Sequence, residues 1–343
     1  MSLSLSILDQ SPIVAGRDPG AAIRETIALA QAADGWGYHR YWMAEHHASA
    51  AQAGSAPEIL IAAIAATTTR IRVGSAGVML PHYASLKIAE QFRVLEAIAP
   101  GRIDLGLGRA PGSDGQTAYA LNPDAARAAD RFPQQVMELI GWTGEGLPVT
   151  HPFAAIRAQP EVPTRPEIWI LGSSDYGAQV AAHFGLPYCF AHFITDGRGA
   201  AEALAIYREK FRPGVLDAPH AAIAVAGLCA ETEAEAWRLW RPREAWRLGR
   251  DRGIFRPLMT MEQAAAWVPA PEDVPRIERR RARALVGTAP ALLARLQALA
   301  AELAVAEVAM LTPCPDTAGR ARSYALLAAA AGLRPEVVGK AAE

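Results

Sequence analysis

Residues 100–109 read Pro-Gly-Arg-Ile-Asp-Leu-Gly-Leu-Gly-Arg and help to decide between two folds. After the Pro-Gly pair, apolar residues at positions 103, 105 and 107 alternate with an aspartate at 104 and glycines at 106 and 108. Such alternation predicts a β-strand. The nucleotide-binding turn of an open sheet would need the spacing G-x-G-x-x-G, and Pro111 stands where the third glycine belongs. The stretch therefore lacks the main signature of an open, doubly wound sheet.

Outward from this strand, the chain alternates short apolar runs with longer helical runs. The predicted strands are 3–8, 38–43, 71–78, 102–107, 167–171, 187–191, 221–229 and 305–311. The predicted helices are 21–34, 57–69, 86–98, 124–142, 174–183, 199–211, 290–303 and 317–330. Alternation of this kind implies a parallel sheet with right-handed crossovers. Eight units favour a closed (β/α)₈ TIM barrel over an open sheet, and we expect a single domain over 1–343.

One segment, at about residues 231–283, interrupts the alternation between the seventh and eighth strands. It carries Trp237, Trp240, Trp246 and Trp267 among many arginines. We interpret it as a helical insertion at the top of the barrel, where it could act as a lid. The alternative is a set of extra helices that only pad the outside.

Composition excludes several classes of protein. Of the 343 residues, 51% are hydrophobic and 20% are charged, which indicates a folded chain. The formal net charge of −1 provides no basic field for a nucleic acid, and no uncharged apolar run is long enough to span a membrane. The 3 cysteines are far apart and the histidines lack metal-binding spacing, so we expect no disulfide framework, no metal site and a reducing, cytoplasmic compartment.

The candidate functional residues follow the strands, because a barrel carries its active site at the carboxyl ends of its strands. The second strand is followed by Glu45, His46 and His47. A histidine titrates near neutral pH, so one of this pair is a candidate general acid or base. The alternative is a pair of half-exposed loop histidines.

A second group of candidates suits an anion with a flat ring attached. Arg109 follows the fourth strand, and the run at 171–177, Leu-Gly-Ser-Ser-Asp-Tyr-Gly, leads from the fifth strand into a helix. A guanidinium and free amides at a helix start would hold a phosphate, although a salt bridge and ordinary capping explain the same residues. Small residues at 74–78 would let a flat group approach the backbone, or simply pack tightly, and the glycines at 106 and 108 would leave a void that a ring could fill. Together these features suit FMN. The expected cofactor-binding residues are Ala76, Gly77, Gly108, Arg109, Ser173, Ser174, Asp175 and Tyr176.

An ordered set of motifs resembles a known family. The motifs are Leu-Ser-Ile-Leu-Asp-Gln-Ser-Pro at 5–12, Tyr-Trp-Met-Ala-Glu-His-His at 41–47, Gly-Ser-Ala-Gly-Val-Met-Leu-Pro at 74–81, the run at 100–109, and Gly-Ser-Ser at 172–174 with Phe-Gly-Leu-Pro at 184–187. They resemble the bacterial luciferase-like, flavin-dependent monooxygenases, in the branch that acts as a single chain. The resemblance covers the whole chain.

The resemblance implies a monooxygenase that uses reduced FMN (FMNH₂), supplied by a separate flavin reductase, and O₂ to oxidise a small organic substrate. By this likeness, His46 is the catalytic base and Ala76-Gly77 is the site of a non-prolyl cis peptide against the flavin ring. Arg109 and Ser174 would hold the phosphate. This chain has Gly108, Ser173 and His192 where luciferase itself has a cysteine, a glutamate and an aromatic residue. The likeness therefore does not imply aldehyde luminescence.

Three further expectations remain open at this stage. The first alternative is the branch of the superfamily that depends on the deazaflavin F420 and transfers a hydride. The second is a flavin-binding relative without turnover. We also expect a homodimer, because the helices at 57–69 and 86–98 are apolar over more than one face, although alanine-rich helices look apolar in any case.

Overall fold

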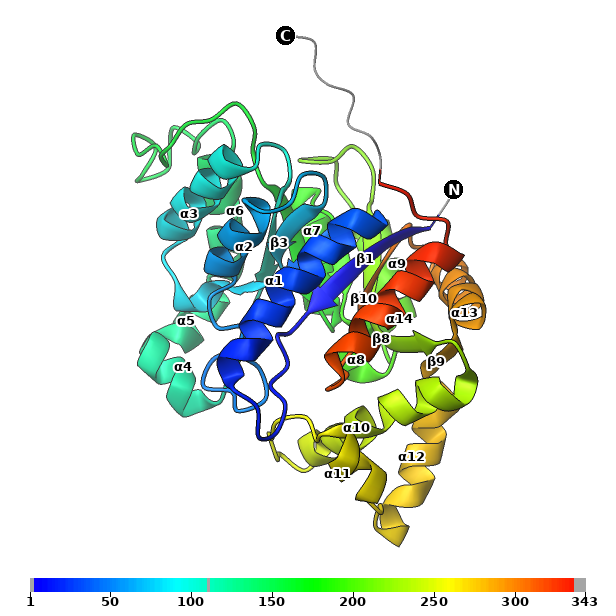
Figure 1. Ribbon diagram of the computed structural model, residues 1–343. Helices are drawn as coiled ribbons and strands as arrows, with labels where there is room; N and C mark the ends of the chain where they lie inside the picture. The colour runs from blue at the N-terminus through cyan, green and yellow to red at the C-terminus, as the bar shows by residue number, and fades with distance from the viewer. Residues whose placement is uncertain (1–2, 110–111, 336–343) are drawn as a thin grey trace.

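In the computed structural model, which describes residues 3–109 and 112–335, eight parallel strands close into a barrel (Figure 1). The strand order is β10-β1-β2-β3-β5-β6-β7-β8, and β8 pairs with β10 to close the ring. The barrel strands are β1 (Ser4–Asp9), β2 (Arg40–Met43), β3 (Arg72–Ser75), β5 (Ile103–Gly108), β6 (Glu167–Gly172), β7 (Tyr188–Phe190), β8 (Ala221–Ala230) and β10 (Glu307–Leu311). The predicted (β/α)₈ barrel is confirmed.

The helices surround this barrel and cover its strands. They are α1 (Pro19–Trp36), α2 (Pro57–Ala65), α3 (Ser85–Ile98), α4 (Gly115–Leu121), α5 (Ala125–Asp130), α6 (Phe132–Thr143), α7 (Asp175–Phe184), α8 (His192–Thr195), α9 (Ala200–Lys210), α13 (Ala289–Glu302) and α14 (Thr317–Ala330). The first and last of them, α1 and α14, lie side by side (Figure 1). The buried face of α1 is rich in alanine, whereas the buried face of α14 also carries Arg320, Ser323 and Tyr324.

Two expected elements are interrupted. The helix expected over 124–142 is split into α5 and α6 at Arg131, because Pro133 lacks an amide hydrogen and suits only the first turn of a helix. The strand expected over 71–78 is divided into β3 and the short β4 (Val78–Met79) by a cis peptide bond between Ala76 and Gly77. The short helices α4 and α8 were not predicted.

The segment at 231–283 does lie between the seventh and eighth barrel strands, β8 and β10. It contains α10 (Glu233–Asp251), α11 (Met261–Ala266), the 3₁₀ turn η2 (Pro271–Asp273) and α12 (Val274–Arg281), and it leads into the unpredicted strand β9 (Leu285–Thr288). β9 pairs with the far end of β8. The arrow of β1 points toward the end of the molecule where these helices lie, so the insertion sits at the carboxyl ends of the strands (Figure 1).

Charged side chains close the opposite end of the barrel. Arg40, at the start of β2, contacts Asp104 at 2.9 Å, Glu167 at 3.1 Å and Glu307 at 3.1 Å. Its guanidinium also stacks on the ring of Trp169, 4.9 Å from the centroid. Although burial opposes ionisation of Glu307, Arg40 lowers the pKa of that carboxyl to about 2. This network fills the amino-terminal end of the barrel with paired charges.

Two further observations concern the whole described chain. No helix in residues 3–109 and 112–335 is long and apolar enough to cross a membrane. Cys189, Cys229 and Cys314 are buried free thiols.

Candidate active site

A cavity of about 390 Å³ opens at the carboxyl ends of the barrel strands. Its size is within the usual range for a cofactor site. Eight of the nine residues predicted from the sequence line it: His46, Ala76, Gly77, Gly108, Arg109, Ser173, Ser174 and Tyr176. Asp175 is not among the lining residues. It is exposed, and its carboxylate accepts a hydrogen bond from Gln179 at 3.3 Å, one turn further along α7.

One edge of this cavity is suited to an anion. The guanidinium of Arg109 lies over the ring of Tyr176, 3.9 Å from its centroid. Ser174 is the N-cap residue of α7, but its side chain makes no capping hydrogen bond. The Tyr188 hydroxyl donates to the Ser174 carbonyl at 3.0 Å and fixes the loop. The start of α7 and a positive charge therefore lie at the same edge of the cavity, an arrangement that suits an anion.

The floor of the cavity is formed by backbone without large side chains. Ala76 and Gly77, joined by the cis peptide bond, both line it. A Cβ on Gly77 would stand 2.7 Å from the carbonyl oxygen of Gly106, so only glycine allows this segment to pack on β5.

The expectation that Gly106 leaves room for a ring is wrong. Its Cα faces the Ser75 carbonyl, with which an added Cβ would collide, and the same Cβ would stand 2.5 Å from Cδ1 of Leu171. The position therefore provides close packing and no space for a ring. Gly108, at the end of the strand, does line the cavity as expected.

His46 lies on the cavity wall and is partly buried. Its amide donates to the Gly54 carbonyl at 2.9 Å, and the Gln52 side-chain nitrogen lies 3.4 Å from its Nε2. Its Nδ1 is buried and has no hydrogen-bond partner in the part of the chain that the structure describes. Burial, with the positive charge of Arg250 and the nearby His47, lowers the pKa of His46 to about 4. The imidazole is therefore neutral at neutral pH and can accept a hydrogen bond or a proton.

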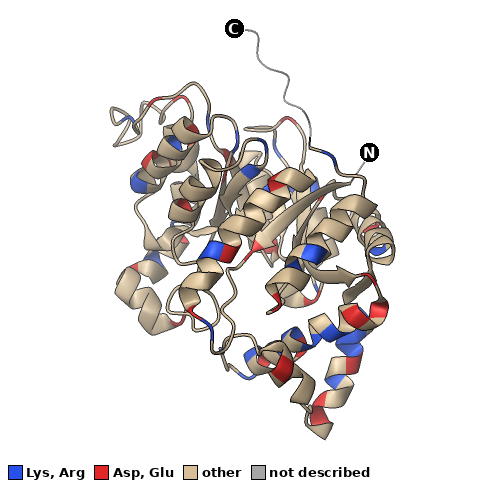
Figure 2. Cartoon of the chain, in the orientation of Figure 1, with Lys and Arg blue, Asp and Glu red and all other residues tan. Residues whose placement is uncertain are grey.

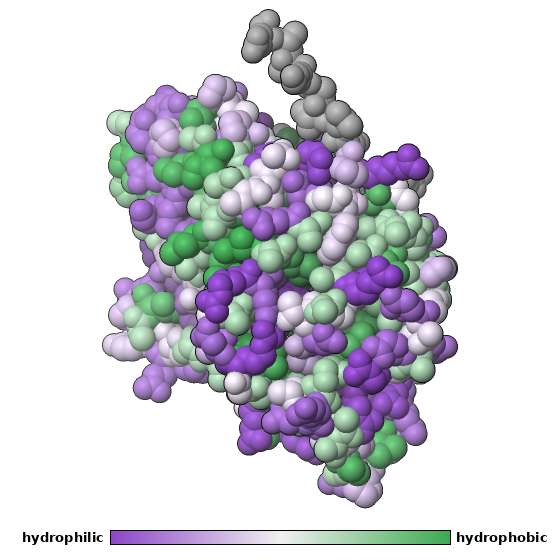
Figure 3. All heavy atoms as spheres, in the orientation of Figure 1, coloured by the Kyte–Doolittle hydropathy of each residue, from purple (hydrophilic) through white to green (hydrophobic). Residues whose placement is uncertain are grey.

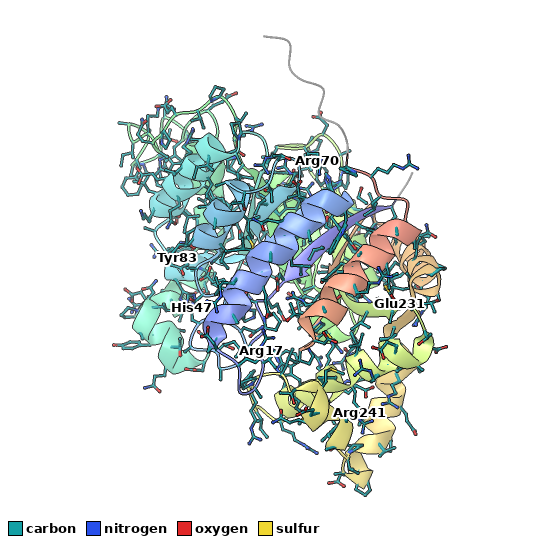
Figure 4. All side chains as sticks on the ribbon, in the orientation of Figure 1. Arg17, His47, Arg70, Tyr83, Glu231 and Arg241 are labelled. Atoms are coloured by element: carbon teal, nitrogen blue, oxygen red, sulfur yellow. The ribbon has the colours of Figure 1, made fainter. Side chains whose placement is uncertain are left out.

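The neighbouring histidine has a structural environment instead. His47 Nε2 lies 2.6 Å from Oε1 of Glu45, which also accepts from the Tyr83 hydroxyl at 2.7 Å. The second oxygen of Glu45 accepts from the Met79 amide at 3.1 Å. Figure 4 shows His47 and Tyr83 close together, beside the barrel mouth. His47 is held by these contacts and does not line the cavity, so the two histidines have different surroundings.

The residues of α10 that line one side of the cavity were not predicted from the sequence. Arg243, Arg247 and Arg250 line it, together with Trp246. Their spacing of four and three residues places the three arginines on one face of a helix. This spacing was visible in the sequence and could have identified them. Within the described ranges, no group of three or more histidine, cysteine, aspartate or glutamate side chains could hold a metal ion.

The comparison with known families agrees with this geometry. The model of the family described as luciferase-like monooxygenase matches residues 3–307. The chain belongs to the luciferase-like monooxygenase family. This luciferase-like chain is 44% identical to the Bacillus subtilis protein YwcH over 327 residues, which cover 95% of this chain and 98% of YwcH. It is 37% identical to the N-acetyl-S-alkylcysteine monooxygenase of the same organism over 329 residues, with 95% and 97% covered.

Solved structures share the fold. Apo-MsnO8 superposes on this luciferase-like chain with a TM-score of 0.87 at 37% identity, covering 97% of this chain and 100% of MsnO8. At lower identity, the fold is shared with an FMN complex of the oxygenating component of 3,6-diketocamphane monooxygenase (TM-score 0.71, 19% identity, 98% and 99% covered). It is also shared with an F420-dependent secondary alcohol dehydrogenase (TM-score 0.58, 14% identity, 96% and 98% covered). These last two likenesses concern the fold alone.

Proposed function

We propose that this protein is a flavin-dependent monooxygenase that uses reduced FMN and O₂ to oxidise a small organic substrate. A separate flavin reductase supplies the reduced FMN. One observation supports the proposal above the others: a single cavity combines an anion site at one edge, a floor of small residues and a buried neutral histidine. FMN carries a phosphate and a flat ring, which fit the anion site and the floor, and the histidine could manage protons beside them.

The phosphate end of FMN fits Arg109 and the start of α7. The Arg109 guanidinium would donate charge-assisted hydrogen bonds to the phosphate oxygens. Ser174 would contribute a hydroxyl that no capping bond occupies, and Ser173 and the first amides of α7 would complete the site. Tyr176 would keep the guanidinium in place through its ring.

The ring of FMN fits the floor at Ala76 and Gly77, where the absence of large side chains allows a flat group to approach the backbone. Gly108 also lines the cavity and has no side chain to occupy the space beside the ring. When bound in reduced form, FMN would supply the electrons for the reaction with O₂.

The protein's own contribution centres on His46. Because its pKa lies near 4, the imidazole stays neutral at neutral pH and would accept a proton at Nδ1, which has no partner within the described residues. Because His46 Nδ1 is buried, water would not compete with the substrate or the flavin for this nitrogen. The arginines and Trp246 of α10 would cover the ring side of the cavity and exclude water there as well.

A second candidate, hydride transfer with the deazaflavin F420, rests on the shared fold of an F420-dependent alcohol dehydrogenase. Equilibrium titration of the protein with FMN and with F420, each followed by its own fluorescence, distinguishes the two. We expect FMN to bind with the lower Kd. Tighter binding of F420 would contradict the proposed cofactor, and the absence of binding by either would contradict a flavin-type site in this cavity.

A further inference from the structure

A second cavity, of about 540 Å³, adjoins the proposed flavin cavity and has no role in the function proposed above. It lies under α10, α12 and α8 of the barrel mouth, and it shares Phe193, Arg243 and Arg247 with the flavin cavity. Its lining contains eight arginines and only three carboxylates. Figure 2 shows many Lys and Arg positions along α10 and α12, with acidic positions among them.

All three carboxylates of this second cavity already have arginine partners. The two carboxylate oxygens of Glu244 accept hydrogen bonds from Nε and Nη2 of Arg281, at 2.6 and 2.7 Å. Asp251 pairs with Arg280 at 2.8 Å and with Arg276 at 3.2 Å. Asp196 lies 3.5 Å from Arg280 and 3.6 Å from Arg247. Among the described residues, the lining therefore carries five more arginines than carboxylates, eight against three.

Arg243 is the most informative of these, because it stands where the two cavities meet. Its Nε is buried and has no hydrogen-bond partner among the residues that the structure places. The guanidinium stacks on Trp240, 4.4 Å from the ring centroid, which holds it in position without satisfying its donors. Burial, together with the charge of Arg247, lowers the pKa of Arg243 to about 10, so the group still carries its charge at neutral pH. A charged donor buried without a partner is costly to the fold, and an anion would supply the missing partner.

The same face of α10 extends this charge toward His46. Arg250 lies two turns from Arg243, lines the flavin cavity and packs on the rings of Trp246 and Phe255, at 4.8 and 5.3 Å. Its charge contributes to the low pKa of His46. A positive strip therefore runs along α10 from the second cavity to the proposed reaction centre, on a different element from Arg109 and the start of α7.

We propose that the substrate is a small organic anion whose anionic group binds Arg243 in the second cavity while the rest of the molecule extends into the flavin cavity. This inference rests on the proposed function, since it assigns the substrate class to that same site. The FMN phosphate would occupy the other edge, at Arg109. The substrate's charge and the cofactor's charge would thus have separate binding groups, and a neutral analogue of the substrate would bind weakly.

The test compares acids with amides of the same shape. Phenylacetate and phenylacetamide, and succinate and succinamide, are titrated calorimetrically into FMN-loaded protein, where FMN blocks the phosphate site. We expect each acid to bind about tenfold more tightly than its amide or better, as a charge-assisted hydrogen bond implies. Arg243→Gln should remove most of this preference. The matched control is Arg238→Gln on the same helix, because Arg238 is exposed, pairs with Glu235 and lines neither cavity.

Three results would overturn the inference: equal binding of acid and amide, an unchanged preference in Arg243→Gln, or no binding of either acid. FMN titrations of the same variants separate this failure from failure of the proposed function. If Arg243→Gln and the parent bind FMN equally while the acid preference is absent, only the substrate class is wrong. If the parent does not bind FMN, the proposed function is wrong, and the acid–amide comparison on the unloaded protein still decides the anion site.

Discussion

Arg109 and His46 lie on the walls of one cavity, and their surroundings suit them to different tasks. Arg109 is an exposed cation beside the start of a helix, which suits it to binding. His46 is neutral and has a buried nitrogen without a partner in the described chain, which suits it to moving a proton. The two roles predict opposite effects of substitution.

Arg109→Ala should weaken FMN binding roughly tenfold or more, because charge-assisted hydrogen bonds to the phosphate are lost. Riboflavin has no phosphate, so its affinity should change little. Titration of the variant with both flavins checks this, with Arg127→Ala on α5 as the control, since Arg127 is exposed and does not line the cavity. Equal losses for the two flavins would show that Arg109 acts through its packing on Tyr176 instead.

The pKa of His46 should lie near 4, which histidine NMR signals followed from neutral into acidic solution can measure. Because protonation occurs only as the pH falls through that value, proton acceptance by His46 should persist well below pH 6.5. Removing a nearby positive charge with Arg250→Gln should raise the pKa. A titration near 6.5 that Arg250→Gln does not alter would contradict the buried setting described here.

The same shift predicts how stability depends on pH. Between pH 6.5 and about 4 the unfolded chain protonates this histidine and the folded chain does not. The free energy of unfolding should therefore decrease as the pH falls through this window. In His46→Gln it should decrease less steeply. Urea unfolding at several pH values measures the difference. Parallel pH profiles of the parent and His46→Gln would contradict the prediction.

Much of the site could be predicted at the level of residues, because the carboxyl ends of barrel strands converge. This rule correctly gathered His46, Gly77, Arg109 and Ser174, which are far apart in the sequence. It could not tell that Asp175 faces away on the first turn of α7.

At the scale of elements, β3, β4 and β5 form the floor of the cavity. The close contact between β3 and β5 depends on Gly106, and the contact of the link between β3 and β4 with β5 depends on Gly77. Gly106→Ala should destabilise the fold by about 1–3 kcal/mol or more, because the new methyl group would collide with the Ser75 carbonyl and contact Leu171. Gly35→Ala, in the last turn of α1 with nothing within 4 Å, should be neutral or stabilise by up to about 1 kcal/mol. Chemical denaturation of both variants tests the comparison. Equal stabilities would mean that β5 does not pack as described.

Element boundaries were predictable where the apolar period was long and unpredictable where tertiary contacts decide. The split at Arg131 follows from Pro133, a signal that the helical period over 124–142 concealed. The four residues of β9 form a strand only because the end of β8 extends beyond the barrel to pair with them. No local pattern could indicate that pairing.

At the scale of the whole molecule, the two ends of the barrel differ in what they bury. The Arg40 network closes one end with paired charges, whereas α10 leaves Arg243 and Arg250 without ion-pair partners in the described chain at the other. The unpartnered Nε of Arg243 therefore lies beside the cavities in which a ligand is proposed to bind. The number and order of the strands were predictable from the sequence, and this asymmetry was not, because it depends on how the insertion folds back.

The outer surface supports the expected homodimer. Ile59 on α2 is 66% exposed, and Val94 and Ile98 on α3 are 48% and 44% exposed. Figure 3 shows hydrophobic residues on the visible face over α2. We predict that the parent sediments as a dimer at micromolar concentration and that Ile59→Glu with Val94→Glu yields monomers, because charge would be buried in the interface. Val149→Glu, at a 93% exposed site in the connection between α6 and β6, should leave the dimer intact. A monomeric parent would contradict this assignment.

The reaction of bound FMNH₂ with O₂ tests the central claim most directly. Protein loaded with reduced FMN under anaerobic conditions is mixed rapidly with O₂, and the return of oxidised-flavin absorbance is followed. The account predicts oxidation at a rate that differs clearly from that of free FMNH₂ and that changes in His46→Ala, by about 10²–10⁴ if His46 acts as a general acid–base. FMN affinity should be nearly unchanged in that variant. Oxidation indistinguishable from free FMNH₂ in both proteins would contradict a monooxygenase site in this barrel.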